Sequence, residues 1–292
     1  MPNKPLKPCK YPGCPELVAS GYCAKHGTEN KKNLQSKKPV ERDKDRQRLY
    51  DRNWQKIRNF HFRKYPWCEK CMDYKKYVSA TDVHHVIPHK GNREIFYKSP
   101  LQSLCHECHS KQTRLENWKD YQINYPLIKQ TPTIPIIMIC GAPASGKSTY
   151  IVQHAENKDI VIDLDLIKAK VSGKPIYFPV DKRYLDLAIR KRNEILENLY
   201  QFDNDGQKVW FIVAAGRYSD RELWRRILSP IQTLVMLPSK AECINRIEAD
   251  QSRRLIKHEQ IAAVHTWFDF YYQIPGEIEV REGGFETSGG GA

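Results

Sequence analysis

Apolar and polar residues follow three different patterns along the chain. Residues 1–30 are rich in proline and glycine and lack an apolar repeat that would build a core. Residues 40–120 combine a helix-like apolar spacing with short extended segments, and residues 131–280 alternate buried apolar runs with helical segments. The pattern predicts a multidomain chain with a small N-terminal module, a central α+β domain and a C-terminal α/β domain with a parallel sheet.

The central part begins with a predicted helix over residues 49–65, which ends at Pro66. Its apolar side chains recur every three to five residues, at Leu49, Trp54, Ile57 and Phe60. Residues 77–80 and 81–87 then read as two short strands, and residues 88–91 as a loop. A helix follows from His109. The predicted order is strand, strand, loop and helix.

The C-terminal part begins after a proline-bearing linker at 119–135. Four buried strands are predicted at 134–140, 159–165, 208–214 and 232–237, with helices between them. The aromatic run at 267–272 favours core packing over base stacking. The tail after residue 281 is predicted to be disordered.

Charge is unevenly distributed along the 292 residues, which carry a net +14. Residues 1–130 hold 27 basic and 13 acidic side chains, whereas the remainder holds 21 of each. The excess favours DNA or another polyanionic partner for the N-terminal half; the alternative is a merely soluble basic surface. We expect no membrane span and a cytoplasmic location, where clustered thiols bind metal more often than they form disulfides.

Seven of the nine cysteines fall within the first 108 residues at metal-ligand spacings. Two structural Zn²⁺ sites are predicted. The N-terminal set could instead be free thiols in a disordered tail, and the isolated Cys140 and Cys243 are predicted core residues. The first site comprises Cys9, Cys14, Cys23 and His26, and the second comprises Cys68, Cys71, Cys105 and Cys108.

A phosphate-binding loop follows the first C-terminal strand in the pattern G-x4-G-K-S. Its backbone N–H groups are expected to cradle the phosphates of ATP, while Lys147 reaches the β- and γ-phosphates and Ser148 holds Mg²⁺. The predicted loop consists of Gly141, Ala142, Pro143, Ala144, Ser145, Gly146, Lys147, Ser148 and Thr149.

Three segments of the central part carry a family resemblance: WCEKC at 67–71, ATDVHHVIPHKG at 80–91 and LQSLCHECHSKQT at 101–113. Together they resemble the HNH endonucleases with a ββα-metal fold, in the four-cysteine subgroup common in phage genomes. The resemblance implies metal-dependent hydrolysis of DNA phosphodiester bonds, with His85 as general base and His84 and His109 as ligands of Mg²⁺ or Mn²⁺. Asp82 and His89 are secondary candidates.

Neutral imidazole suits the role of a base near pH 7, and a bound cation suits the scissile phosphate. An alternative stays open for the paired histidines, because adjacent strand residues point to opposite faces and one of the pair may serve only packing. The family's middle Asn is replaced by Pro100 in this chain. In the family, that Asn mostly holds the loop against the catalytic strand.

The C-terminal half resembles P-loop kinases of the polynucleotide-kinase and zeta-toxin type, through Asp165 with Lys168 and through Arg246 and Arg253. The resemblance implies that Asp165 orients or deprotonates an acceptor hydroxyl. The two arginines would neutralise charge on the transferring phosphoryl group. Asp163 is an alternative magnesium-binding acid.

The sequence therefore predicts a DNA endonuclease fused to an ATP-binding kinase-like domain. In one alternative, the P-loop domain is an ATP-driven regulator of the nuclease. In the other, the protein is an end-processing kinase with a DNA-binding zinc module.

Overall fold

The computed structural model describes residues 6–11, 13–27, 47–116, 124–202, 205–281 and 286–288. The chain divides into two compact units, residues 1–48 and 49–292. The predicted linker at 31–48 lies almost wholly outside the described residues. None of the helices in the described ranges has the length and apolar character needed to cross a membrane.

The N-terminal unit contains a two-stranded antiparallel ribbon, formed by β1 (Lys7–Pro8) and β2 (Leu17–Val18). A single turn of helix follows at residues 24–27. Among the described residues of this unit, the buried apolar-type side chains are Cys9 and Cys23. The ribbon thus folds around its cysteines rather than around an aliphatic core.

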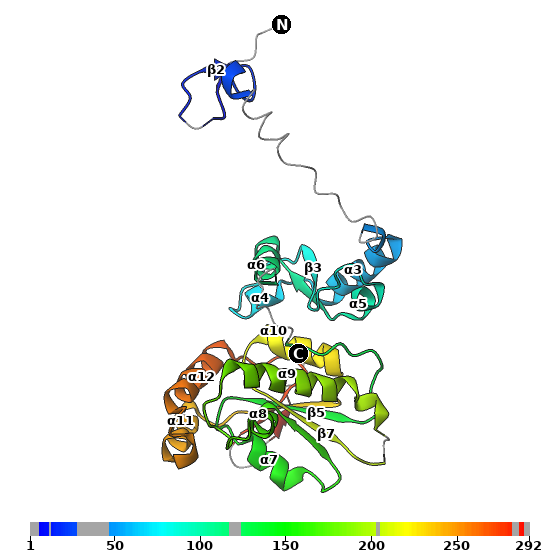
Figure 1. The fold of residues 1–292 in the computed structure, drawn as a ribbon, viewed down its shortest axis with the longest axis vertical. Coiled ribbons are helices and arrows are strands. Elements are labelled where there is room, and N and C mark those ends of the chain that lie inside the picture. Colours follow the sequence, from blue (N-terminus) through cyan, green and yellow to red (C-terminus); the bar gives the residue numbers. More distant parts are fainter. Residues whose placement is uncertain are drawn as a thin grey trace. The chain divides into compact units, whose positions relative to one another are not determined.

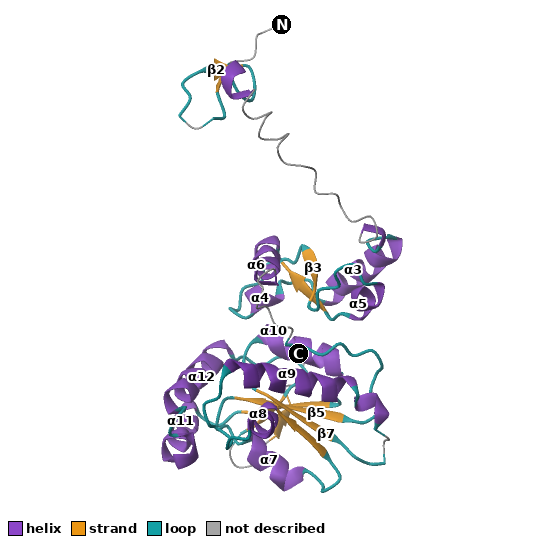
Figure 2. Cartoon of the chain, in the orientation of Figure 1, coloured by secondary structure: helices purple, strands orange, loops and turns teal. Residues whose placement is uncertain are grey.

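The first half of the second unit, residues 49–116, is an α+β fold built around a short hairpin (Figures 1 and 2). Strand β3 pairs antiparallel with β4, and His84 lies opposite Gln102 in the register. Helix α6 follows β4 directly. The elements are α3 (Arg52–Lys64), α4 (Glu69–Met72), β3 (Asp82–His85), α5 (Arg93–Lys98), β4 (Leu101–Leu104) and α6 (His106–Glu116).

Two predictions for this half are wrong in detail. The second strand of the hairpin is β4, not residues 77–80, which contribute only an isolated bridge from Ser79 to Trp67. Tyr77 and Val78 are exposed and therefore have no core face to cover. Helix α3 is present and is capped by Asp51, but Phe60 is exposed and the neighbouring His61 is buried in its place. Helix α5 was not predicted.

The second half, residues 124–288, is an α/β fold around a sheet of order β10-β9-β8-β5-β7-β6. Strands β5 to β9 are parallel, and β10 is antiparallel to β9. Figure 1 shows helices on both faces of this sheet. The strands are β5 (Ile136–Gly141), β6 (Ile160–Asp163), β7 (Val209–Val213), β8 (Gln232–Met236), β9 (Ile278–Val280) and β10 (Glu286–Ser288). The helices are α7 (Lys147–His154), α8 (Leu164–Ser172), α9 (Lys182–Glu197), α10 (Tyr218–Leu228), α11 (Lys240–Ala249) and α12 (Lys257–Phe270).

The four predicted strands are confirmed, and β9 was missed because it has only three residues. Residues 286–288 form a strand, contrary to the predicted disordered tail, whereas 282–285 and 289–292 lie outside the described residues. Strand β5 is buried along its whole length, with alternate residues in two apolar clusters on opposite faces of the sheet. Cys140, Cys243 and Trp267 lie in one of these clusters, so their predicted core roles are confirmed.

The short helix α4 packs against α10, which joins the two halves of the second unit. Arg226 on α10 forms a salt bridge with the buried Glu69 on α4. Glu69 also accepts a hydrogen bond from the N–H of Ser103 on β4, at 2.8 Å. Asp73 accepts two further hydrogen bonds from Ser219. One carboxylate therefore binds α4, β4 and α10 together.

Candidate metal and nucleotide sites

The four N-terminal ligand candidates converge on one point. The Sγ atoms of Cys14 and Cys23 are 4.0 Å apart, and Nδ1 of His26 lies 3.2 Å from Cys23 Sγ and 3.7 Å from Cys9 Sγ. Four ligands on a tetrahedral zinc with Zn–S bonds of about 2.3 Å have sulfur atoms about 3.8 Å apart. The donor set and spacing therefore fit a tetrahedral Zn²⁺. Tyr11 stacks on the imidazole of His26 and fixes its plane.

The second four-cysteine cluster also has tetrahedral spacing. Cys71 Sγ lies 3.9 Å from Cys105 Sγ and 3.8 Å from Cys108 Sγ, and Cys68 completes a group within 4.8 Å. Cys68 is the N-cap of α4 and Cys71 lies within it, whereas Cys105 precedes α6 and Cys108 lies in its first turn. An ion held there would link α4 to the element that carries His109. This site fits a structural Zn²⁺ with no position left for substrate.

The hairpin and α6 bring His84 and His109 together. Their ring centroids are 5.4 Å apart at an interplanar angle of 70°. His84 is buried, and burial together with the neighbouring His84 lowers the pKa of His109. Neutral imidazole is the form that binds a metal ion. The lowered pKa of His109 favours this neutral form.

His85 points to the opposite side of β3, as the alternation of a strand requires. Its ring stacks on Trp54 of α3, with the ring centroids 4.9 Å apart. The ring centroids of Phe96 on α5 and of His89 lie 4.6 and 5.0 Å from that of His85. The hydroxyl of Tyr50 lies 3.1 Å from Nε2 of His89. The aromatic cluster fixes the plane of the His85 imidazole. His85 therefore lies on the same strand as His84, but its side chain contacts a different set of residues.

Pro100 stands where the family has an Asn, and the residue before it, Ser99, links the loop to the strand that carries the histidines. The side-chain hydroxyl of Ser99 accepts a hydrogen bond from the N–H of Ile87 at 2.9 Å, and the carbonyl of Pro100 accepts one from Val86. Both bonds hold the loop to the end of the strand that carries the histidines. Ser99 thus makes the loop-to-strand link that the resemblance assigns to the missing Asn.

The phosphate-binding loop has the backbone shape that its glycines allow. Gly141 and Gly146 have φ of +158° and +95°, and a Cβ on Gly141 would lie 2.4 Å from Ser145 Oγ. Lys147 donates hydrogen bonds to the carbonyls of Gly141 and Ala142 at 2.9 and 2.6 Å. Burial lowers the pKa of Lys147 to about 8. The loop and the start of α7 line one end of a cavity of 1130 Å³.

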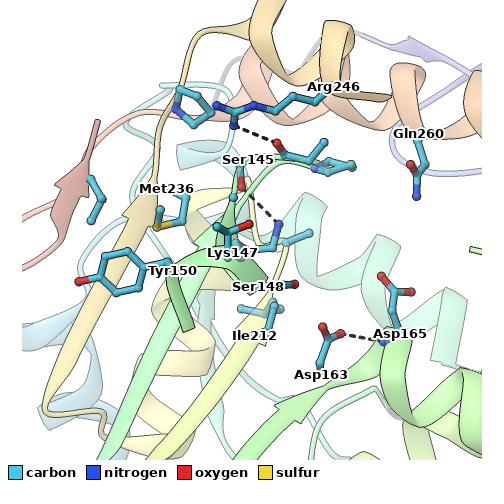
Figure 3. Close-up of a pocket in the computed structure, with 18 of the residues that line it drawn as sticks. Ser145, Lys147, Ser148, Tyr150, Asp163, Asp165, Ile212, Met236, Arg246 and Gln260 are labelled. Atoms are coloured by element: carbon cyan, nitrogen blue, oxygen red, sulfur yellow. Dashed lines mark hydrogen bonds between the residues drawn. The ribbon is translucent and has the colours of Figure 1, made fainter. Parts of the chain in front are cut away.

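The same cavity collects the predicted kinase residues (Figure 3). Asp163 ends β6, and its side chain accepts a hydrogen bond from the N–H of Asp165 at 2.8 Å. Nζ of Lys168 lies 2.8 Å from Oδ1 of Asp165. Arg246 donates to the carbonyl of Ala144 in the loop at 3.3 Å. In Figure 3 the two acids lie across the cavity from Arg246, with Lys147 and Ser148 between them.

Arg253 is held inside the cavity wall by three contacts. It donates to Asp250 at 2.8 Å and to Gln260 at 2.7 Å, and its guanidinium lies 3.7 Å from the ring centroid of Tyr177. Sequence reasoning did not identify Gln260 and Tyr177 as part of this wall. The contacts of Trp54 and Ser99 around the histidines were not predicted either, because each joins elements separated in sequence.

Comparisons with known proteins find two family models that match parts of the chain. Residues 68–115 match the family model described as HNH endonuclease, which confirms the resemblance over that segment. Residues 1–53 match a model described as a domain of unknown function (DUF8602). No curated protein matches the chain.

Solved structures similar to the chain match about half of it. They include TT1252 from Thermus thermophilus (18% identity, TM-score 0.34, 53% of this chain and 91% of that one) and shikimate kinase from Bacteroides thetaiotaomicron (18%, 0.34, 47% and 81%). Thymidylate kinase from Candida albicans is also similar (14%, 0.31, 51% and 84%). The predicted fold class is confirmed: a cysteine-rich N-terminal module and an HNH region are joined to a P-loop α/β sheet.

The two thiol clusters predict a metal count. We expect two zinc ions per chain by elemental analysis, one after Cys14→Ser and one after Cys105→Ser. Cys243→Ala, which alters a cysteine outside both clusters, should leave the count at two. A count of one in the unmodified protein, unchanged by Cys14→Ser, would contradict the N-terminal site.

The lowered pKa of Lys147 predicts a pH dependence of ATP binding. The free protein loses the ammonium charge as the pH rises through about 8. Bound phosphates favour the charged form, so ATP binding should take up a proton above about pH 8 and weaken as pH rises further. Calorimetry in two buffers of different ionisation enthalpy measures this uptake. Equal heats at pH 8.5 in both buffers would contradict it.

Proposed function

We propose that residues 49–116 form a metal-dependent endonuclease site that hydrolyses DNA phosphodiester bonds. The approach of His84 on β3 to His109 on α6, with ring centroids 5.4 Å apart, carries this proposal, because imidazole is a common ligand of divalent ions. The HNH family match over the same residues supports it.

Each histidine has a distinct role in this proposal. His84 and His109 hold the ion, which supplies Lewis-acid stabilisation of the scissile phosphate when bound. His85 accepts the proton of the attacking water as general base. Its stacking on Trp54 and Phe96 fixes the ring plane, so the proton-accepting nitrogen keeps one direction. Ser99 keeps this end of the strand in place through Ile87.

DNA is the substrate that the charge distribution favours. The excess of 27 basic over 13 acidic side chains in residues 1–130 suits a phosphate backbone, whereas the remaining residues are balanced. The N-terminal cysteine module carries part of this charge. We assign it to nucleic-acid contact.

Residues 124–281 are proposed to bind ATP with Mg²⁺ and to transfer its γ-phosphate. Lys147 and the loop N–H groups hold the phosphates, Ser148 binds the magnesium ion, and Asp165 orients the acceptor hydroxyl. Arg246 and Arg253 face the same cavity and neutralise the transferring group. Asp163 is available as a second magnesium-binding acid because it ends β6 beside the loop.

A second candidate role for this half is regulation of the nuclease by ATP. Arg221 favours it: this buried side chain donates to the carbonyls of Ala215 and Gly216, which follow β7 beside the cavity. Arg221 lies on α10, the helix that contacts α4 through Arg226 and Ser219. A change at the nucleotide cavity therefore has a continuous packed route to the nuclease half.

Plasmid nicking tests the nuclease. The unmodified chain should nick supercoiled DNA with Mn²⁺ or Mg²⁺, and His85→Ala should lower the rate at least about 100-fold, which is the usual contribution of a general base. His106→Ala is the matched control, because that side chain is 84% exposed on the adjacent helix. No cutting by the unmodified chain, or equal cutting by His85→Ala, would rule out the proposal.

Transfer of labelled γ-phosphate to an oligonucleotide with a 5′-hydroxyl tests the kinase. Asp165→Asn should abolish transfer while ATP still binds, and Glu194→Gln, a change on an exposed helix face, should have no effect. ATP hydrolysis without transfer, combined with nicking that changes when ATP is added, would favour the regulatory role. Transfer by a chain that never nicks DNA would favour an end-processing kinase.

A further inference from the structure

The segment around α4, residues 67–78, presents aromatic side chains to solvent. Tyr74 and Tyr77 are 60% and 68% exposed, and Trp67 is 42% exposed. The rings of Trp67 and Tyr77 lie next to each other, with centroids 5.8 Å apart at an interplanar angle of 83°. Large apolar side chains that gather in one place on a surface mark an interaction site.

Backbone hydrogen bonds hold this segment in a fixed shape. The N–H groups of Tyr74 and Lys76 donate to the carbonyl of Cys71, at 3.0 and 3.1 Å. The N–H of Cys68 donates to the carbonyl of Val78 at 2.7 Å, which closes the base of the loop. The rings are therefore displayed on an ordered loop, so little conformational entropy is lost when they bind a partner.

Cationic side chains lie among these rings. Nζ of Lys75 lies 5.8 Å from the ring centroid of Tyr272. The guanidinium of Arg217 lies 3.5 Å from the ring centroid of Phe270 and 6.0 Å from that of Tyr74. Phe270 and Tyr74 are themselves in edge-to-face contact, with centroids 5.3 Å apart. Positive charge and aromatic rings are thus interleaved on one surface.

The carboxylates beside this surface already have partners. Asp73 is buried and accepts two hydrogen bonds from Ser219. The Oδ1 atom of Asp220 lies 3.8 Å from Nζ of Lys70. The exposed residues 74–79 have the sequence YKKYVS, which contains two lysines and no acid. The charge that this surface offers to a partner is therefore positive.

We propose that this segment is a binding surface for single-stranded nucleic acid, on which unpaired bases stack while lysines contact the phosphates. The excess of 27 basic over 13 acidic side chains in residues 1–130 favours nucleic acid over a protein partner. The members of this aromatic surface are Trp67, Tyr74, Lys75, Lys76 and Tyr77. The inference rests on the proposed function only in taking nucleic acid as the partner.

The surface also sets which form of nucleic acid is bound. A base in a duplex is already stacked between its neighbours, so it has no open face to offer to a ring. An unpaired base does have one, and aromatic side chains bind it through that face. We therefore expect the aromatic surface to hold an unpaired strand, beside whichever contacts the chain makes to a duplex.

Fluorescence anisotropy of labelled oligothymidylate tests this on the full zinc-loaded chain, without added Mg²⁺ or Mn²⁺. Tyr77→Ala should weaken single-strand binding at least about fivefold, the lower end of the effect of removing one stacking ring. Duplex binding should change by less than about twofold. Tyr77→Trp keeps an aromatic face and should retain the affinity. Tyr184→Ala is the matched control, because that ring is 37% exposed on α9, outside the aromatic surface.

The dependence on salt separates stacking from charge. Replacing both Lys75 and Lys76 with Gln should reduce the slope of log affinity against log salt by about 1.4, since each phosphate contact of a single strand contributes about 0.7. Tyr77→Ala should leave this slope unchanged. Unchanged zinc content in each variant shows that the fold is retained. Single-strand affinity of Tyr77→Ala within about twofold of the unmodified chain, or equal losses for single strand and duplex, would overturn the proposal.

These measurements do not depend on DNA cleavage. If the chain never nicks DNA but Tyr77→Ala loses single-strand binding, the aromatic surface stands and the nuclease proposal fails. If the chain nicks DNA and Tyr77→Ala binds oligothymidylate normally, the nuclease stands and the aromatic surface is wrong. That second result would leave the exposed rings to a protein partner.

Discussion

The carboxylate of Glu69 is the contact on which the arrangement of the second unit depends. It is only 1% exposed, receives a salt bridge from Arg226 and accepts the N–H of Ser103. Removing one partner of such a buried pair costs about 3–5 kcal/mol, because the other charge is left uncompensated. Glu69 lies between Cys68 and Cys71, so the short helix beside two of the predicted zinc ligands also attaches the hairpin to α10.

This construction explains how a short ββα segment forms an ordered site. The hairpin has two four-residue strands and little apolar core of its own, so packing on α10, together with the predicted zinc site, supplies the missing constraints. Arg221 ties that platform to the backbone beside the nucleotide cavity and to Glu277, with both side chains fully buried. The hairpin half and the backbone beside the nucleotide cavity are therefore both attached to α10, whichever role ATP has.

Motifs that act through contiguous residues could be predicted from the sequence. The phosphate-binding loop and the closely spaced cysteines within each cluster could be recognised from their spacing in the sequence. In the structure, the members of each cysteine cluster lie together, and the loop lines the cavity. The second strand of the hairpin was misplaced, because residues 77–80 have β-forming side chains but no partner to cover them. Contacts between distant elements were out of reach: no spacing rule connects Glu116 to His84, Ser99 to Ile87 or Arg226 to Glu69.

The central claim is that the end of the hairpin and helix α6 together hold one catalytic ion. Anomalous diffraction from crystals of the full chain grown with Mn²⁺, recorded on both sides of the manganese absorption edge, tests this most directly. The account predicts a manganese peak within about 2.4 Å of ligand atoms of His84 and His109. Manganese bound elsewhere, with no peak beside His84, would contradict it.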